Sequence, residues 1–208
     1  MRADGGVDEY NGTHVRVRTR RDADLEACVR ALRTVHGTSG YPRNWPADPP
    51  GWLCQGGELG AWVAEAPDGD IVGHVALTAP AAGDVAPGLW RAEQGACAQG
   101  VRARGAAVVG RLFVAPRGHG HGIGRALLTQ VVSCTDRLGL WPVLDVVAVD
   151  PAVAFYERIG WRRLGTGEQN WGAGELVDVH CYAAPGPAGY AAPSRPALLA
   201  RRTTPGKE

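Results

Sequence analysis

The feature that most constrains the fold is a glycine-rich segment between a run of apolar residues and a helix-like stretch, at residues 112–128, LFVAPRGHGHGIGRALL. The apolar residues up to Val114 predict a strand, and Pro116 ends it because proline cannot donate to a sheet ladder. Glycines at positions 118, 120, 122 and 124 allow tight turns and close approach of the backbone to a ligand. The helix predicted from Ile123 to Leu138 would offer unpaired amides and its dipole to a phosphate.

Two familiar phosphate-binding loops do not fit this segment. A Walker A loop requires Gly-Lys followed by Ser or Thr, and no lysine occurs here. A dinucleotide fingerprint requires GxGxxG within an early βαβ unit, whereas these glycines alternate singly. His119 and His121 have no Cys, Asp or Glu beside them, so the sequence predicts no metal site.

Strand-like and helix-like patterns alternate along the rest of the chain. Asp68-Gly69 between two apolar runs predicts a hairpin, because this dipeptide tolerates the positive φ angles of a tight turn. A stiff loop rich in aromatic residues and proline is expected at 41–52, and a long connection with a short helix near Trp90 at 80–106. The alternation predicts an α/β domain with a mixed sheet. The expected strands are 14–18, 61–65, 71–78, 107–114, 142–149, 161–164 and 176–182, and the expected helices are 22–36, 123–138 and 151–159.

Composition and length narrow the class of protein. The 208 residues suit one domain at 14–184, preceded by a flexible polar lead at 1–13 and followed by a flexible tail at 185–208. A formal net charge of +1 disfavours nucleic acid as a partner, and no apolar run reaches membrane-spanning length. The five cysteines are scattered without a CxxC pair, which favours reduced thiols in a cytoplasmic protein.

Two segments resemble the motifs of the GNAT superfamily of N-acetyltransferases. Residues 119–124, HGHGIG, are similar to its pyrophosphate-binding motif, with His119 where Gln or Arg is usual. Residues 143–161, VLDVVAVDPAVAFYERIGW, resemble its second motif, with Val149 at the usual Asn position. The resemblance implies a GNAT-like (acyl-CoA N-acyltransferase) α/β fold, in which a central mixed twisted β-sheet flanked by helices holds acetyl-CoA where two strands splay apart.

The resemblance also assigns roles to particular residues. Tyr156 stands where the family has a tyrosine that protonates the leaving thiolate of coenzyme A, as general acid catalysis requires. Backbone amides of the strand before the glycine loop would hold the thioester carbonyl and the pantetheine. The residues expected to bind the cofactor are Leu112, Phe113, Val114, His119, Gly120, His121, Gly122, Ile123, Gly124, Arg125 and Phe155.

The acceptor side is less defined by sequence. No carboxylate stands on the strand before the loop, so the base that deprotonates the amine is unassigned. Asp145 lies in an apolar strand and must either have a buried partner or face the cleft, and His74 is either a second candidate or a satisfied core histidine. Tyr41, Trp45 and Trp52 either wall the acceptor or pack their loop onto the domain, and Arg43 either pairs with a carboxylate or phosphate on the acceptor or is solvated.

The predicted function is therefore transfer of an acetyl group from acetyl-CoA to a primary amine by direct attack, without a metal. The amine could belong to a small molecule or to a peptide. Two alternatives stay open: a non-catalytic sensor with a GNAT fold that binds acyl-CoA, and an acetyltransferase acting on protein N-termini or lysines. No segment announces a dimer interface, so a homodimer also stays open.

Overall fold

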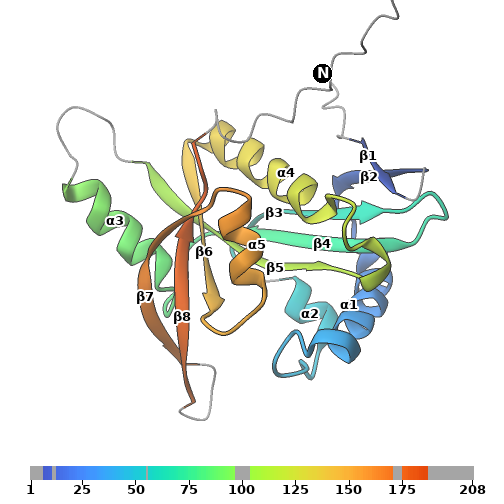
Figure 1. Ribbon diagram of the computed structural model, residues 1–208, viewed down its shortest axis with the longest axis horizontal. Helices are drawn as coiled ribbons and strands as arrows, with labels where there is room; N and C mark the ends of the chain where they lie inside the picture. Colours follow the sequence, from blue (N-terminus) through green and yellow to red (C-terminus); the bar gives the residue numbers. More distant parts are fainter. Residues whose placement is uncertain (1–6, 11–12, 55, 97–103, 171–174, 187–208) are drawn as a thin grey trace, which may run out of the picture.

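The computed structural model describes residues 7–10, 13–54, 56–96, 104–170 and 175–186. Within these ranges the chain forms one eight-stranded sheet with the order β1-β2-β3-β4-β5-β6-β8-β7 (Figure 1). Every neighbouring pair is antiparallel except β5 and β6, which run parallel. The mixed α/β sheet predicted from the sequence is thus confirmed. The strands are β1 Val7–Tyr10, β2 Thr13–Thr19, β3 Glu58–Glu65, β4 Ile71–Thr78, β5 Gly105–Val114, β6 Leu140–Val147, β7 Arg162–Asn170 and β8 Leu176–Ala183.

Helices connect these strands, and the two longest end at a glycine in the left-handed conformation. Gly40 caps the first long helix with φ 74°, and Gly139 caps the helix after the glycine loop with φ 68°. The first long helix was expected to end at residue 36 but continues to Ser39, so Gly37 lies inside it. The α-helices are α1 Leu25–Ser39, α2 Pro49–Leu53, α3 Ala86–Ala96, α4 Ile123–Leu138 and α5 Ala152–Arg158, and short 3-10 turns occupy η1 Asp22–Asp24 and η2 Pro116–Gly118.

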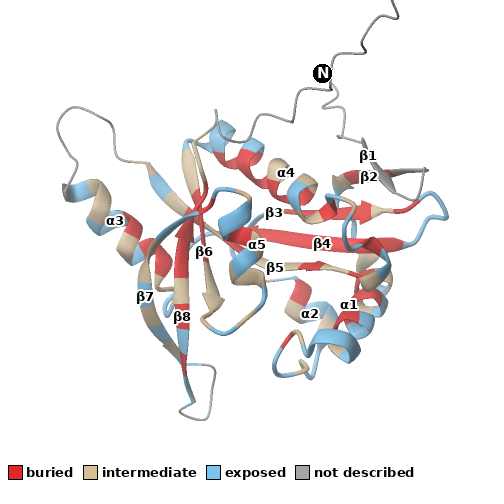
Figure 2. Ribbon diagram, in the orientation of Figure 1, coloured by how far each residue is buried: buried red, intermediate tan, exposed pale blue. Residues whose placement is uncertain are grey.

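The helices cover both faces of the sheet, and Figure 2 shows β4 buried along its length, whereas β5 is largely intermediate in burial. Helices α4 and α5 pack on one face, where Leu127, Val131 and Tyr156 join the largest apolar cluster. Helix α1 covers part of the opposite face around Leu32, and α3 covers the rest around Trp90. All eight residues of β4 are buried, as expected for a strand covered on both faces.

The parallel pair β5 and β6 separates part of the way along its length. Pairing runs from Gly105↔Leu140 to Val108↔Val143 and then stops, although both strands continue. The remainder of β6 pairs with β8 on its other side, and the remainder of β5 pairs with β4. Figure 1 shows the two strands diverging beside α5. The sheet therefore opens in a V after Val108, which is the splay expected from the sequence.

Several elements differ from the sequence expectation, and β7 continues to Asn170 although its strand was expected to end at 164. Val7–Tyr10 forms β1 against β2 within the segment expected to be an irregular lead. Pro49–Leu53 forms α2 inside the expected loop, because proline suits a first helical turn and the Asp48 side chain accepts from the Gly51 amide. Strand β6 ends at Val147 rather than Val149, and most of the expected tail lies outside the described residues.

Candidate functional site

The glycine loop ends in a helix N-terminus that faces outward with unpaired amides. Gly120 and Gly122 have φ angles of 81° and 75°, a left-handed conformation that side chains disfavour. The first hydrogen bond of α4 runs from the Ala126 amide to the Gly122 carbonyl, at 3.0 Å. The amides of Ile123 and Gly124 therefore have no acceptor within the helix, which suits an anionic ligand.

The two loop histidines hold the loop in shape. The His119 ring donates from Nε2 to the Val114 carbonyl at 2.9 Å, because a carbonyl can only accept. The His121 ring donates from Nδ1 to the His119 carbonyl at 2.8 Å. Within the described residues no three His, Cys, Asp or Glu side chains gather as metal ligands. Both imidazoles thus contact the backbone around the loop.

The direction of the β5 amides follows from one hydrogen bond. The Ala115 amide donates to the Val72 carbonyl of β4 at 2.8 Å. Because successive residues of an antiparallel strand alternate, the Val114 amide then points away from β4, into the V, and the Phe113 amide points back toward β4. The Phe113 ring is 4% exposed and stacks on His74 with centroids 5.4 Å apart. The predicted amide contact thus fits Val114, whereas Phe113 supports the site by packing.

The two sequence motifs contact each other through a glycine. A β-carbon built on Gly124 would lie 3.0 Å from Cζ of Phe155, closer than ordinary packing allows. A β-carbon on Gly118 would lie 2.9 Å from the Cδ1 atom of Ile123. These close approaches bring α5 against the start of α4 and fold the loop onto β5, so both motifs border the opening between the strands.

Tyr156 lies on α5 in an aromatic cluster. Its side chain is buried, at 7% exposure, and its ring centroid is 5.7 Å from that of Trp161 and 6.2 Å from that of Tyr182. The Tyr182 hydroxyl donates to Glu157 at 2.9 Å. These contacts fix the ring of Tyr156 on the face of the sheet that carries α4 and the glycine loop.

His74 is fully buried and both of its ring nitrogens have partners. Arg20 Nη1 lies 3.0 Å from Nε2, and since arginine only donates, Nε2 accepts. Nδ1 is then the protonated nitrogen and donates to the Arg111 carbonyl at 3.0 Å. Burial, followed by the nearby guanidinium charges, lowers the pKa of His74 to about 4. The structure thus places this candidate base in the core, as a neutral positioning residue.

Asp145 has the buried partners that its position requires. Its two carboxylate oxygens accept from the amides of Val85 and Ala86 at 3.0 and 2.9 Å, at the start of α3. Gln169 donates to it at 2.7 Å. Burial raises the pKa of this carboxyl group. Hydrogen bonds from the Cys181 side chain and from the backbone amides of Val85 and Ala86 oppose that shift. The carboxylate therefore caps the N-terminus of α3, on the face of the sheet that α3 covers.

The aromatic residues predicted to wall the acceptor pack in and beside the α1–α2 loop. Tyr41 meets Trp52 edge to face at 6.2 Å, and burial raises the pKa of the Tyr41 hydroxyl to about 12. Trp45 packs separately against His36 at 5.1 Å. Tyr41 and Trp45 thus share one apolar cluster with α1 but make different contacts.

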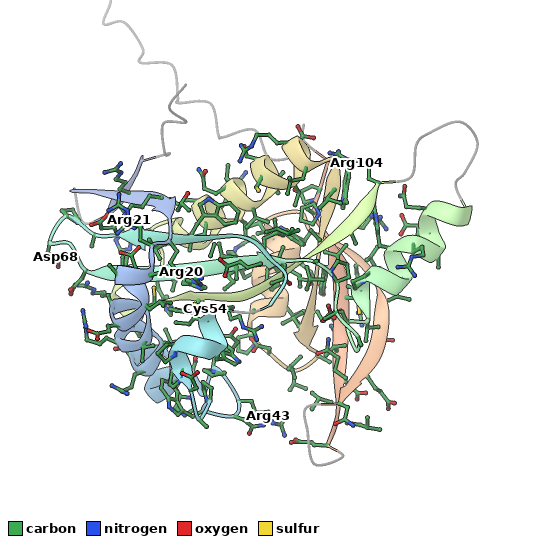
Figure 3. All side chains as sticks on the ribbon, turned by 180° about the vertical axis from the view of Figure 1, so that it is seen from behind. Arg20, Arg21, Arg43, Cys54, Asp68 and Arg104 are labelled. Carbon is green, nitrogen blue, oxygen red and sulfur yellow. The ribbon has the colours of Figure 1, made fainter. Side chains whose placement is uncertain are left out.

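Arg43 is exposed at the tip of this loop, where Figure 3 shows it pointing toward the β7–β8 hairpin. Its Nη2 atom lies 2.8 Å from Oε1 of Glu175, which precedes β8. The arginine expected to meet an anionic substrate therefore has an internal carboxylate partner, and the ion pair joins the two segments.

Arg111 was not among the candidate site residues predicted from the sequence, but it lies beside the α1–α2 segment that carries them. It stands in the apolar strand β5 with φ 51°, at the bulge where the β4–β5 register shifts. Its Nε donates to the Trp52 carbonyl at 2.9 Å, and its guanidinium lies 4.4 Å from the Trp52 ring centroid. The available signal was a lone charge after Gly110 in an apolar strand that also carries the predicted cofactor amides.

Comparisons with known proteins agree with this geometry. The model of the acetyltransferase (GNAT) domain matches residues 58–163. Among curated proteins, none matches the sequence significantly. Similar solved structures share 13–20% identity, which shows the fold alone.

Three of these structures belong to different kinds of acetyltransferase. NAA60 from Arabidopsis thaliana in complex with acetyl-CoA has 20% identity and a TM-score of 0.58, with 82% of this chain and 98% of that chain covered. A ribosomal-protein-alanine N-acetyltransferase from Brucella melitensis has 20% identity and a TM-score of 0.54, with 81% and 98% covered. A phosphinothricin acetyltransferase from Sinorhizobium meliloti in complex with acetyl-CoA has 18% identity and a TM-score of 0.56, with 82% and 88% covered. The domain match and the splayed sheet together identify the chain as a member of the GNAT acetyltransferase family.

Proposed function

We propose that this protein transfers the acetyl group of acetyl-CoA directly to a primary amine. The observation that carries the proposal is the opening of the sheet after the Val108↔Val143 pair, bordered by the glycine loop and by α5. Such an opening offers strand amides to a linear amide-containing ligand, while the helix N-terminus suits its pyrophosphate. Two of the similar structures were solved with acetyl-CoA.

In the proposed reaction the amine nitrogen bonds to the acetyl carbon, and the carbon–sulfur bond breaks. Backbone amides of β5, with Val114 as the one whose direction is defined, would polarise the thioester or hold the pantetheine. Tyr156 would give its proton to the leaving sulfur. The proton released by the amine would pass to solvent, since His74 is sealed in the core and Asp145 caps a helix.

The acceptor is proposed to be the amine of a small molecule. The ion pair between Arg43 and Glu175 ties the α1–α2 loop to the turn end of the β7–β8 hairpin, where Glu175 directly precedes β8. A bridge between these segments favours a confined acceptor space over an open groove for a chain. Acceptors on proteins remain the second candidate, because NAA60 and the ribosomal-protein-alanine enzyme are among the similar structures.

The test is a thiol-release assay with acetyl-CoA, in which a panel of small primary amines is compared with peptides bearing free N-termini or lysines. Turnover of a small amine, with the acetylated product identified by mass spectrometry, supports the proposal. Turnover of peptides alone moves the function to the protein-acetylating alternative. Binding of acetyl-CoA without turnover of any amine would leave a cofactor-binding sensor as the better account.

A further inference from the structure

Arg111 differs from the other arginines that reach the interior. Arg18 pairs with Asp24 and Glu65, and Arg20 pairs with Glu58, so both guanidinium charges are neutralised. Arg111 is partly buried, and among the described residues it makes no salt bridge. Burying a charged group without a carboxylate in contact with it costs free energy. The presence of an arginine at this position therefore needs an explanation.

The backbone and side chain of Arg111 are held firmly in place. A left-handed φ of 51° is unfavourable for a residue with a side chain, and such outliers gather at functional sites. The His74 ring bonds to the Arg111 carbonyl, while the Trp52 carbonyl and ring hold its Nε and one face of its guanidinium. The strained residue is therefore positioned from two sides.

The two terminal nitrogens of Arg111 are left available. Within the described part of the chain they have no hydrogen-bond partner, and the only sealed side-chain atom without one is Nδ1 of His180. The terminal nitrogens are thus not completely sealed from solvent, and their donors form the planar fork that matches a carboxylate.

Arg111 also lies where the acceptor would enter. It stands three residues before Val114, which is about 10 Å along an extended strand, on the part of β5 that β6 no longer covers. Trp52, which contacts the Arg111 side chain, also meets the Tyr41 ring edge to face at 6.2 Å. The α1–α2 segment that carries the predicted acceptor residues therefore lies against this part of β5.

We infer that Arg111 binds an anionic group of the acceptor, so that the substrate is a small primary amine that also carries a carboxylate or a similar anion. This rests on the proposed acetyltransferase function and narrows its substrate class. Arg43, the anchor expected from the sequence, already has Glu175 as its partner. A carboxylate of the acceptor would make two parallel hydrogen bonds with the Arg111 guanidinium and neutralise its positive charge.

The experiment incubates the full chain with acetyl-CoA and an equimolar mixture of amino acids, their C-terminal amides and aliphatic diamines, with products identified by mass spectrometry. Acetylated amino acids should dominate, and kcat/KM for the best one should exceed that of its amide by about 10- to 100-fold. Arg111→Gln should remove this preference mainly by raising KM, with little change for the amide, and Arg111→Lys should restore part of it.

Matched variants and separate binding measurements make the outcomes distinct. Arg162→Gln removes an exposed arginine paired with Glu93 and should leave the preference unchanged. Equal turnover of amides or diamines by the wild type, or loss of the preference in Arg43→Gln but not in Arg111→Gln, would overturn the inference while the acetyltransferase function stands. Absence of acetyl-CoA binding, measured by calorimetry, would overturn the function and the inference together.

Discussion

Phe155 lies so close to Gly124 that a β-carbon at the glycine would stand 3.0 Å from its ring. One residue belongs to the start of α4 and the other to α5, so this contact joins the two motifs that the sequence showed separately. The glycine is therefore required for packing between helices as well as for the phosphate-binding turn.

The Gly124→Ala variant should lose stability and cofactor affinity together. Its methyl group would push the Phe155 ring, and overpacking of this kind costs about 1–3 kcal/mol of unfolding free energy. Gly37→Ala is the control, because no atom lies within 4 Å of its β-carbon position in α1, and it should stabilise by up to about 1 kcal/mol. Urea denaturation compares the two, and equal stability changes would argue against the close contact.

Tyr156→Phe should reduce kcat by about 100- to 10,000-fold while the affinity for acetyl-CoA is kept, because only the proton donor is removed. Tyr182→Phe is the matched control, since that ring stacks on Tyr156 and its hydroxyl contacts Glu157. It should keep kcat within about twofold. A normal kcat for Tyr156→Phe would reduce Tyr156 to a packing residue.

His74 should make stability depend on pH. Its pKa is about 4 in the folded chain against an ordinary 6.5, so between these values only the unfolded chain takes up the proton. The free energy of unfolding should therefore fall as the pH drops from about 6.5 to about 4, by at most about 3 kcal/mol from this group, and level off below. Denaturation curves of wild type and His74→Gln at pH 7 and 4.5 check this. An identical pH dependence in both proteins would contradict it.

Asp145→Asn separates the two roles considered for this carboxylate. As the cap of α3 it accepts from the Val85 and Ala86 amides, and the variant keeps one acceptor oxygen. We expect a loss of about 1–2 kcal/mol in unfolding free energy with kcat nearly unchanged. A large fall in kcat at retained stability would instead show that Asp145 serves as the catalytic base.

The sequence predicted the local elements better than their long-range partners. Helix α4 begins and ends where the periodicity placed it, since Gly122 and Gly139 mark its ends in the sequence itself. Strand β1 and helix α2 were missed because pairing with β2 and a cap from Asp48 stabilise them, rather than a strong pattern of their own. Among the described residues, no helix is long and apolar enough to cross a membrane.

The residues of the candidate site also fall into two groups, those that the sequence locates and those whose contacts only the fold creates. The glycine loop and Phe155 could be located from motifs, because their chemistry depends on residues adjacent in sequence. The partners of Asp145 and Arg43 could not, because the amide of Ala86 and the carboxylate of Glu175 approach only through the fold. Arg111 escaped notice for the same reason, as its unusual backbone and its stacking on Trp52 are tertiary features.

Calorimetric titration with acetyl-CoA tests the central claim most directly, using wild type, Gly122→Glu and Gly139→Glu. Both glycines have positive φ angles and open space around them, so the two variants carry similar backbone strain at opposite ends of α4. Wild type and Gly139→Glu should bind, whereas Gly122→Glu should not, because its carboxylate would repel the pyrophosphate at the helix N-terminus. Equal binding by all three proteins, or binding by none, would contradict the placement of the cofactor on the glycine loop.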